Sequence, residues 1–151
     1  MQLSRHKAVR GCVLTLLAYV LSSSAFSQDE WPLVWGDYWE VTGIEIKDGG
    51  GWDYANWLAT EWRENEEFAK SKGWIKDFML LGNVHPRDGE PNVYLIRIRE
   101  RLPTGSEGEQ REKEFMEWKK ASAEEMVEAS GNRAEYREVM SSTLLQSLSF
   151  R

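Results

Sequence analysis

The stretch Tyr38-Trp39-Glu40-Val41-Thr42-Gly43-Ile44-Glu45-Ile46-Lys47 decides the fold. Within it Thr42, Ile44 and Ile46 recur at every second position, and a period of two predicts a β-strand with one face toward a core. The four residues that follow, 48–51, are one aspartate and three glycines, a composition typical of a turn. We therefore expect a strand over residues 38–47 and a turn directly after it.

The pattern downstream switches between the helical period and the strand period. Aromatic and aliphatic side chains recur at helical spacing after the turn, so we expect a helix that Asp53 caps and Gly73 ends in the left-handed conformation. The elements predicted after residue 47 are a helix over 53–72, strands over 74–84 and 93–102, a helix over 109–130 ended by Gly131-Asn132, a short helix over 133–141 and a strand over 143–151. Their order, β-α-β-β-α-β, is that of the ferredoxin-like split βαβ fold.

This order predicts a single α+β domain over residues 38–151, in which helices cover one face of a four-stranded antiparallel sheet. The face beneath the helices would carry Thr42, Ile44, Ile46, Tyr94, Ile96 and Ile98. The opposite face would carry Val41, Gly43, Glu45, Val93, Leu95, Arg97 and Arg99. Because soluble monomers usually avoid an open apolar face, we predict a two-fold homodimer that pairs through it.

The same stretch resembles a known family. The strand over 38–47 followed by a tryptophan-rich helix is similar to the opening of dimeric α+β barrel proteins, which include stress-responsive barrels, antibiotic-biosynthesis monooxygenases and NIPSNAP-like domains. The resemblance covers residues 38–151 and implies that two ferredoxin-like sheets pair into a barrel. No catalytic motif of an enzymatic branch is found, so the resemblance implies no functional residue.

The N-terminus has the three parts of a secretory signal peptide. A cationic start precedes an apolar run over residues 12–21, and small residues then occupy the two positions that a signal peptidase reads. The run is shorter than the roughly 20 residues that a membrane-spanning helix needs. We therefore predict a signal peptide over 1–27, a leading segment over 28–37, and an exported protein, periplasmic or secreted, with no stable membrane insertion after cleavage.

Cleavage before Gln28 would leave an acidic chain. Three basic residues lie in the predicted signal, so 16 of the 19 lysines and arginines would remain against 25 acidic residues, a net charge of −9. Proteins bind nucleic acid and anionic membrane surfaces mainly through basic residues. The composition therefore argues against both classes of partner.

The mature chain would lack the residues of most metal and nucleophile sites. The only cysteine, Cys12, and one of the two histidines, His6, would leave with the signal. Thiolate ligation and a histidine-rich metal or haem site within one protomer are then excluded. Residues 48–51 are not followed by the Lys-Ser/Thr of a phosphate-binding loop. We predict no metal and no cofactor.

His85 is the candidate for acid-base catalysis. It stands in Asn83-Val84-His85-Pro86, just after a predicted strand. Because histidine titrates near neutral pH, it could transfer a proton at the mouth of a pocket. A loop histidine that faces water is the alternative interpretation.

Arg97, Arg99 and Arg101 project from one face of a predicted strand at two-residue spacing. Arginine forks suit carboxylate and phosphate groups, so these residues could form a cationic patch inside a dimer barrel. Ion pairing across the sheet is the alternative, with Glu45 the expected partner of Arg97. Arg97, Arg99 and Glu45 are therefore candidate ligand-binding residues.

Eight tryptophans would remain in the mature chain. Trp52, Trp57 and Trp62 are five residues apart, so they wind around the predicted helix and cannot all face one core. Core and dimer packing is one use for such residues, and a pocket for a planar ligand is the other. Trp62 is the aromatic candidate, with Tyr94 as its neighbour under the helices.

Two sites and two functions stay open from these candidates. The first site joins Trp62 with Tyr94 and His85, and the second joins Arg97 with Glu45 and Arg99. The first function is an exported homodimer that binds a small hydrophobic or anionic molecule. The second is a cofactor-free enzyme, monooxygenase- or isomerase-like, acting on a small planar or carboxylate substrate. The lack of a catalytic motif favours the first, and a purely structural domain that binds a partner also remains open.

Overall fold

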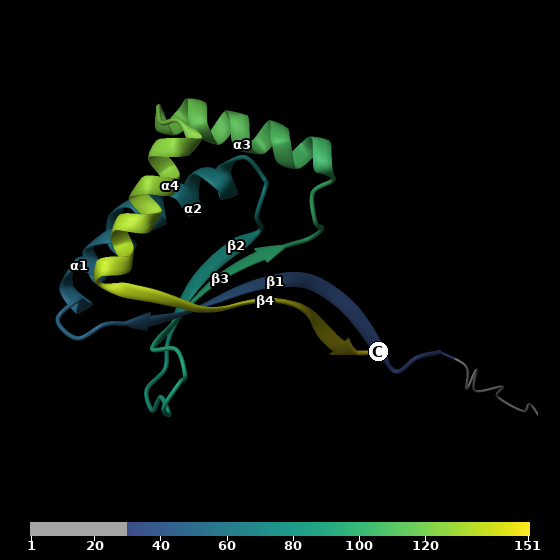
Figure 1. Ribbon diagram of the computed structural model, residues 1–151. Coiled ribbons are helices and arrows are strands. Elements are labelled where there is room, and N and C mark those ends of the chain that lie inside the picture. The colour runs from purple at the N-terminus through teal and green to yellow at the C-terminus, as the bar shows by residue number, and fades with distance from the viewer. Residues whose placement is uncertain (1–29) are drawn as a thin grey trace, which may run out of the picture. The chain divides into compact units, whose positions relative to one another are not determined.

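A four-stranded antiparallel sheet with helices along one side forms the architecture, which is therefore α+β (Figure 1). The structure is a computed structural model that describes residues 30–151, of which residues 31–151 form one unit. The predicted signal peptide, residues 1–27, lies outside the described residues. Within residues 30–151 no helix is long and apolar enough to cross a bilayer.

The strands lie in the order β2-β3-β1-β4, and every neighbouring pair is antiparallel. Their bounds are Leu33–Ile46 (β1), Asp77–Gly82 (β2), Val93–Arg99 (β3) and Arg137–Phe150 (β4). The helices are α1 (Gly51–Trp57), α2 (Arg63–Ser71), α3 (Gly105–Lys119) and α4 (Ala123–Asn132). A π-helical turn at Leu58–Trp62 joins α1 to α2, and a short 3₁₀ turn at Arg133–Glu135 precedes β4.

The register between β1 and β3 decides which side chains face the helices. Glu40 is paired with Arg97 and Thr42 with Leu95, and directly opposed residues project to the same side of a sheet. Leu95 packs on the core beneath α1, and Arg97 contacts α2, so this side is the helix-facing one. The predicted orientation was right for β1 but wrong for β3.

The correction for β3 concerns all seven of its residues, including Val93, which is paired with the buried Ile44 and so lies on the helix-facing side. Leu95, Arg97 and Arg99 face the helices, whereas Tyr94, Ile96 and Ile98 alternate with them and face the other side. Apolar residues occupy both faces of this strand, so alternation alone could not identify the inner one. The arginines are tolerated on the inner face because carboxylates on β1 and α2 pair with them.

The core lies between α1 and the sheet. Tyr54, Leu58 and Trp62 are four residues apart, and together with Ile44 they form the buried cluster, on which Leu95 packs. Burying each such side chain contributes about 1.5–3 kcal/mol before conformational entropy is subtracted. The hydrophobic stripe of the first helix and the inner face of β1 therefore supply the centre of the fold.

Several helix boundaries differ from the prediction. The first helix begins at Gly51, Asp53 lies inside its first turn, and no side chain caps it, whereas Gly73 is left-handed as expected (φ 68°). The predicted helix over 109–130 is two helices, because Lys120 adopts a left-handed conformation (φ 52°) and ends α3. Capping boxes at Thr104 and Ser122 start α3 and α4.

The outer strands are longer than predicted. β4 begins at Arg137, so most of the short helix expected over 133–141 is strand, and Gly131 lies inside α4 instead of ending it. β1 begins at Leu33 and takes in part of the leading segment, residues 28–37. Beyond the end of β3 the strands β1 and β4 continue as a two-stranded ribbon, visible where they curve away from the sheet in Figure 1.

Candidate ligand-binding site

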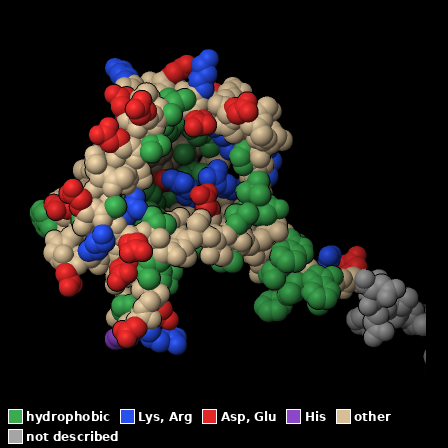
Figure 2. Space-filling model, viewed as in Figure 1, with side chains coloured by type: hydrophobic (Ala, Val, Ile, Leu, Met, Phe, Trp, Pro, Cys, Tyr) green, Lys and Arg blue, Asp and Glu red, His purple; other side chains and the backbone are tan. Residues whose placement is uncertain are grey.

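A cavity of about 550 Å³ lies between the helices and the inner face of the sheet. This volume falls within the roughly 300–1,000 Å³ typical of small-molecule sites. Figure 2 shows the hollow, with apolar side chains on its walls and basic side chains at its floor. Its lining comes from the first helix, the loop before β2, β3, α3 and the turn after α4, so it forms only when these distant segments come together.

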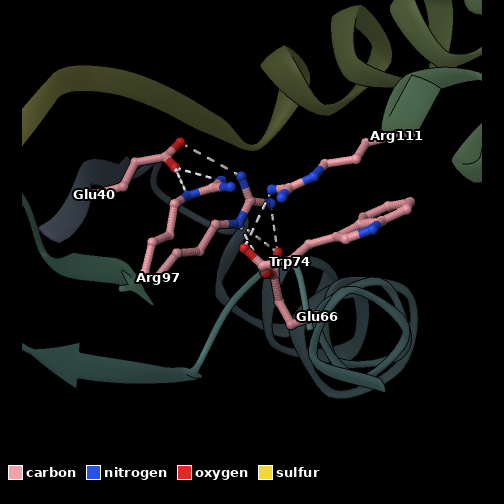
Figure 3. Close-up of polar contacts among 6 residues, drawn as sticks. Glu40, Glu66, Trp74, Arg97 and Arg111 are labelled. Atoms are coloured by element: carbon pink, nitrogen blue, oxygen red, sulfur yellow. Dashed lines mark hydrogen bonds and ion pairs between the residues drawn. The ribbon is translucent and has the colours of Figure 1, made fainter. Parts of the chain in front are cut away.

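Two ion pairs build the floor of the cavity (Figure 3). The Nε–H of Arg97 donates to both carboxylate oxygens of Glu66, at 2.8 and 2.9 Å, and its Nη2 also bonds to the same group. Arg99 Nη2 donates to Glu40 at 2.8 Å. Glu40 also lies 3.5 Å from Arg97 Nη1, so the two pairs form one network.

Glu66 is the most deeply buried charge of this network, with 1% of its side chain exposed. A buried carboxylate needs a charged partner, and Arg97 supplies that partner with bidentate geometry. Burial opposes the charged form of Arg97, but hydrogen bonding and charge attraction from Glu66, with a smaller contribution from Glu40, outweigh it and raise the pKa of Arg97. Arg97 therefore stays charged across the physiological range of pH.

Two further arginines line the cavity without such partners. The guanidinium of Arg133 lies 4.4 Å from the ring centroid of Trp57, and that of Arg111 lies 6.0 Å from the centroid of Trp74. Among the described residues neither forms an ion pair, and the buried Nε of Arg133 has no hydrogen-bond partner. Burial, and then repulsion by Arg137, lower the pKa of Arg133.

Aromatic side chains form the walls. Trp57, Trp62, Trp74 and Phe115 all contribute to the lining. Trp57 is stacked on the buried Tyr54 at 5.5 Å between ring centroids, with 16° between the planes, which fixes its orientation. Flat aromatic walls next to guanidinium groups favour a ligand that combines a planar apolar body with negative charge.

The structure brings together three of the candidates that the sequence indicated. Trp62, Arg97 and Arg99 line the same cavity, although they were assigned to alternative sites. The partner of Arg97 is not Glu45, because Glu40 is the residue opposite it and Glu45 is exposed opposite Glu138.

The remaining two candidates lie elsewhere. Tyr94 faces the other side of the sheet, opposite Gly43. His85 lies exposed in the loop between β2 and β3, where its backbone N–H donates to Asn83 Oδ1 at 3.2 Å, and it is not among the residues that line the cavity.

Sequence reasoning missed Glu66, Glu40, Arg111 and Arg133. For Glu66 a signal was present, because it follows Trp62 by four residues and continues the inward stripe of the helix. It stands, however, in the acidic cluster Glu64-Asn65-Glu66-Glu67, a composition typical of a solvated helix face. For Arg111 and Arg133 the sequence holds no comparable signal. They reach the cavity because α3 and α4 fold back over the first helix, an arrangement that local patterns do not encode.

Comparisons with protein-family models, with curated proteins and with solved structures return no match to this chain. Within residues 30–151 no group of three or more histidine, cysteine, aspartate or glutamate side chains could hold a metal ion. A functional conclusion therefore depends on the geometry of the cavity.

Proposed function

We propose that this chain is an exported binding protein that takes up a small apolar or anionic molecule in the cavity between the helices and the sheet. The observation that carries the proposal is the combination of aromatic walls with unpaired arginines in one hollow of about 550 Å³. Binding sites typically join apolar walls to a few converging polar groups.

A variant that fills the cavity tests the proposal. A Cβ built on Gly108, which lines the cavity, meets no atom within 4 Å, and the same holds for Gly105, which does not line it. Both glycines lie in α3, so Gly108→Phe and Gly105→Phe form a matched pair. Native mass spectrometry of protein purified from its own host should find a retained small molecule in wild type and in Gly105→Phe, and should lose it in Gly108→Phe. Equal retention by both variants would place the molecule elsewhere.

A ferredoxin-like fold forms part of the proposal. The strand order β2-β3-β1-β4 and the chain order of strands and helices support it. In such a fold the helices cover one face of the sheet and leave the other open, which is the face through which dimeric α+β barrels would pair.

We also propose a homodimer that pairs through the sheet face opposite the helices. This outer face carries, by register, Trp39, Val41, Met79, Leu81, Tyr94, Ile96, Ile98 and Leu145. By the same register Asp77 and Glu45 add acidic side chains to this face. Ile96 and Ile98 are already buried, at 3% and 8% exposed, so the apolar side chains left most open are Leu81 and Leu145, at 49% and 53%. A second copy of the same face would cover them, and a two-fold axis is the commonest arrangement.

Charge placed on this face tests the dimer. Leu81→Lys and Leu145→Lys should shift sedimentation equilibrium at micromolar concentration from the dimer mass to the monomer mass. Val127→Lys, at a 72% exposed position on α4, serves as the matched control and should leave the mass unchanged. A monomer mass for wild type would refute the proposal.

Export remains a prediction from the N-terminal sequence. Cleavage before Gln28 would give a chain that starts there, and the intact mass of the exported protein measures this directly. A full-length mass in the membrane fraction would contradict it.

The alternative of a cofactor-free enzyme has less support. It depended on His85 as acid or base, and His85 is not among the residues that line the cavity. His85→Ala is therefore expected to retain the small molecule as wild type does, which native mass spectrometry of the variant purified from the host would measure.

A further inference from the structure

The charges around the cavity do not cancel. Four arginines line it, at positions 97, 99, 111 and 133, against the carboxylates of Glu66 and Glu112. Glu40, which pairs with Arg99, supplies one more negative charge next to the lining. The balance is one net positive charge, within a chain whose formal net charge is −6. The cavity therefore suits a monoanion better than a neutral molecule or a dianion.

Arg133 is the arginine least compensated by its surroundings. The carboxylates of Glu66 and Glu40 hold Arg97 and Arg99, whereas Arg133 forms no ion pair among the described residues and lies over the ring of Trp57. The ion pairs also hold Arg97 and Arg99 in place as structural groups, because moving either arginine would leave a carboxylate without its partner. An incoming carboxylate would gain most from Arg133, since binding there would break no ion pair among the described residues and would give its buried Nε a hydrogen-bond acceptor.

Arg111 has a different role in this arrangement. Figure 3 shows it reaching from α3 over Trp74 toward the pair of Arg97 and Glu66. Its Nη1 has one long contact, 3.5 Å to the backbone oxygen of Trp74. The flat guanidinium and the indole together extend the planar wall, against which an aromatic ring can stack.

We propose that the ligand of the cavity is a planar aromatic monocarboxylate, whose carboxylate pairs with Arg133 and whose ring lies between the walls formed by Trp57, Trp74 and Phe115. This inference rests on the proposed function, because it names the ligand class of the same cavity. The net charge of the lining selects a monoanion, the stacked tryptophan orients Arg133, and the aromatic walls select a planar body.

The test compares two probes of nearly the same shape, naphthoate and its neutral amide, naphthamide, by calorimetric titration and by tryptophan quenching. Wild type should bind naphthoate about tenfold or more tightly than naphthamide, since a charge-assisted bond is about twice as strong as a neutral one. Arg133→Gln should bring the two affinities together, Arg133→Lys should restore part of the difference, and Arg87→Gln should retain all of it. Arg87 is 87% exposed in the β2–β3 loop and serves as the matched control.

Each other outcome overturns a stated part of the reasoning. Equal affinities of wild type for both probes would leave a binding cavity but overturn the carboxylate class. A preference for naphthoate that survives in folded Arg133→Gln would place the carboxylate away from Arg133. If wild type binds neither probe, the proposed ligand class is wrong. The proposal of a binding cavity would then still be supported if Gly108→Phe loses the molecule retained from the host. If Arg133→Gln does not fold, the comparison of the two probes in wild type still decides the class.

Discussion

Replacing Arg97 by methionine should destabilise the protein far more than neutralising its partner. Arg97→Met leaves Glu66 charged at 1% exposure without a partner, and an uncompensated buried charge costs about 3–5 kcal/mol. Glu66→Gln leaves Arg97 beside Glu40, with 39% of its side chain exposed to water, so the cost should be about 1–3 kcal/mol. The asymmetry follows from the unequal burial of the two partners.

The double variant, Glu66→Gln with Arg97→Met, should be more stable than Arg97→Met alone, because it removes the stranded charge. Urea unfolding followed by tryptophan fluorescence measures all three free energies, and Arg87→Met controls for loss of an exposed arginine. For a domain of this size the loss in Arg97→Met corresponds to a melting temperature lower by about 10–20 °C. A cost below about 1 kcal/mol for Arg97→Met, or no recovery in the double variant, would refute the assignment of Glu66 as a buried, paired charge.

Three further predictions follow from other parts of the fold. Gly50→Ala should lower the free energy of unfolding by about 1–3 kcal/mol, because the new Cβ would lie 2.5 Å from the backbone oxygen of Tyr136. Gly51→Ala should not lower it, because a Cβ at that position meets no atom within 4 Å, and urea unfolding compares the two variants. Ser122→Ala should cost about 1 kcal/mol in the same assay, because it removes the capping box of α4. Burial raises the pKa of Tyr54 to about 12 from 10.0, so the unfolded state ionises first and stability should fall as the pH rises between these values. Tyr54→Phe should lose this component of the alkaline transition and gain up to about 1 kcal/mol at pH 7, since the buried hydroxyl has no hydrogen-bond partner among the described residues.

The order of strands and helices could be predicted from the amino-acid sequence because each element has its own hydrophobic periodicity. Ile44 and Ile46 alternate clearly, and Tyr54, Leu58 and Trp62 repeat at four residues, so local pattern and burial agree. The boundaries that failed depend on capping and on single backbone conformations. Lys120 ends α3 in a left-handed conformation that a lysine rarely adopts, and no pattern of residues predicted this helix end.

The site was less predictable because the positions of its charged side chains depend on partners distant in sequence and not on the polarity of neighbouring residues. Arg97 lies on the inner face because Glu66, more than thirty positions earlier, meets it there, so neither residue could be placed from its own neighbourhood. Alternation correctly placed Arg97 and Arg99 on the same face of β3 but could not identify which face meets the helices. Glu45 was chosen as the partner of Arg97 because both residues were assigned to the outer face. Cross-strand register, which the sequence alone leaves free, was the missing quantity.

Attraction between the cavity and an anion must act at short range. The formal net charge of the whole chain is −6, so its average field repels an approaching carboxylate. At ionic strengths near 0.1 M that field decays over about 10 Å, whereas a guanidinium inside the cavity is shielded far less. Glu66 and Glu40 offset the charges of Arg97 and Arg99, so Arg111 and Arg133 are the lining arginines that remain to bind a ligand. Selectivity for an anion would then reside in the position of two side chains that α3 and the turn after α4 carry over the sheet, and not in the composition of the chain.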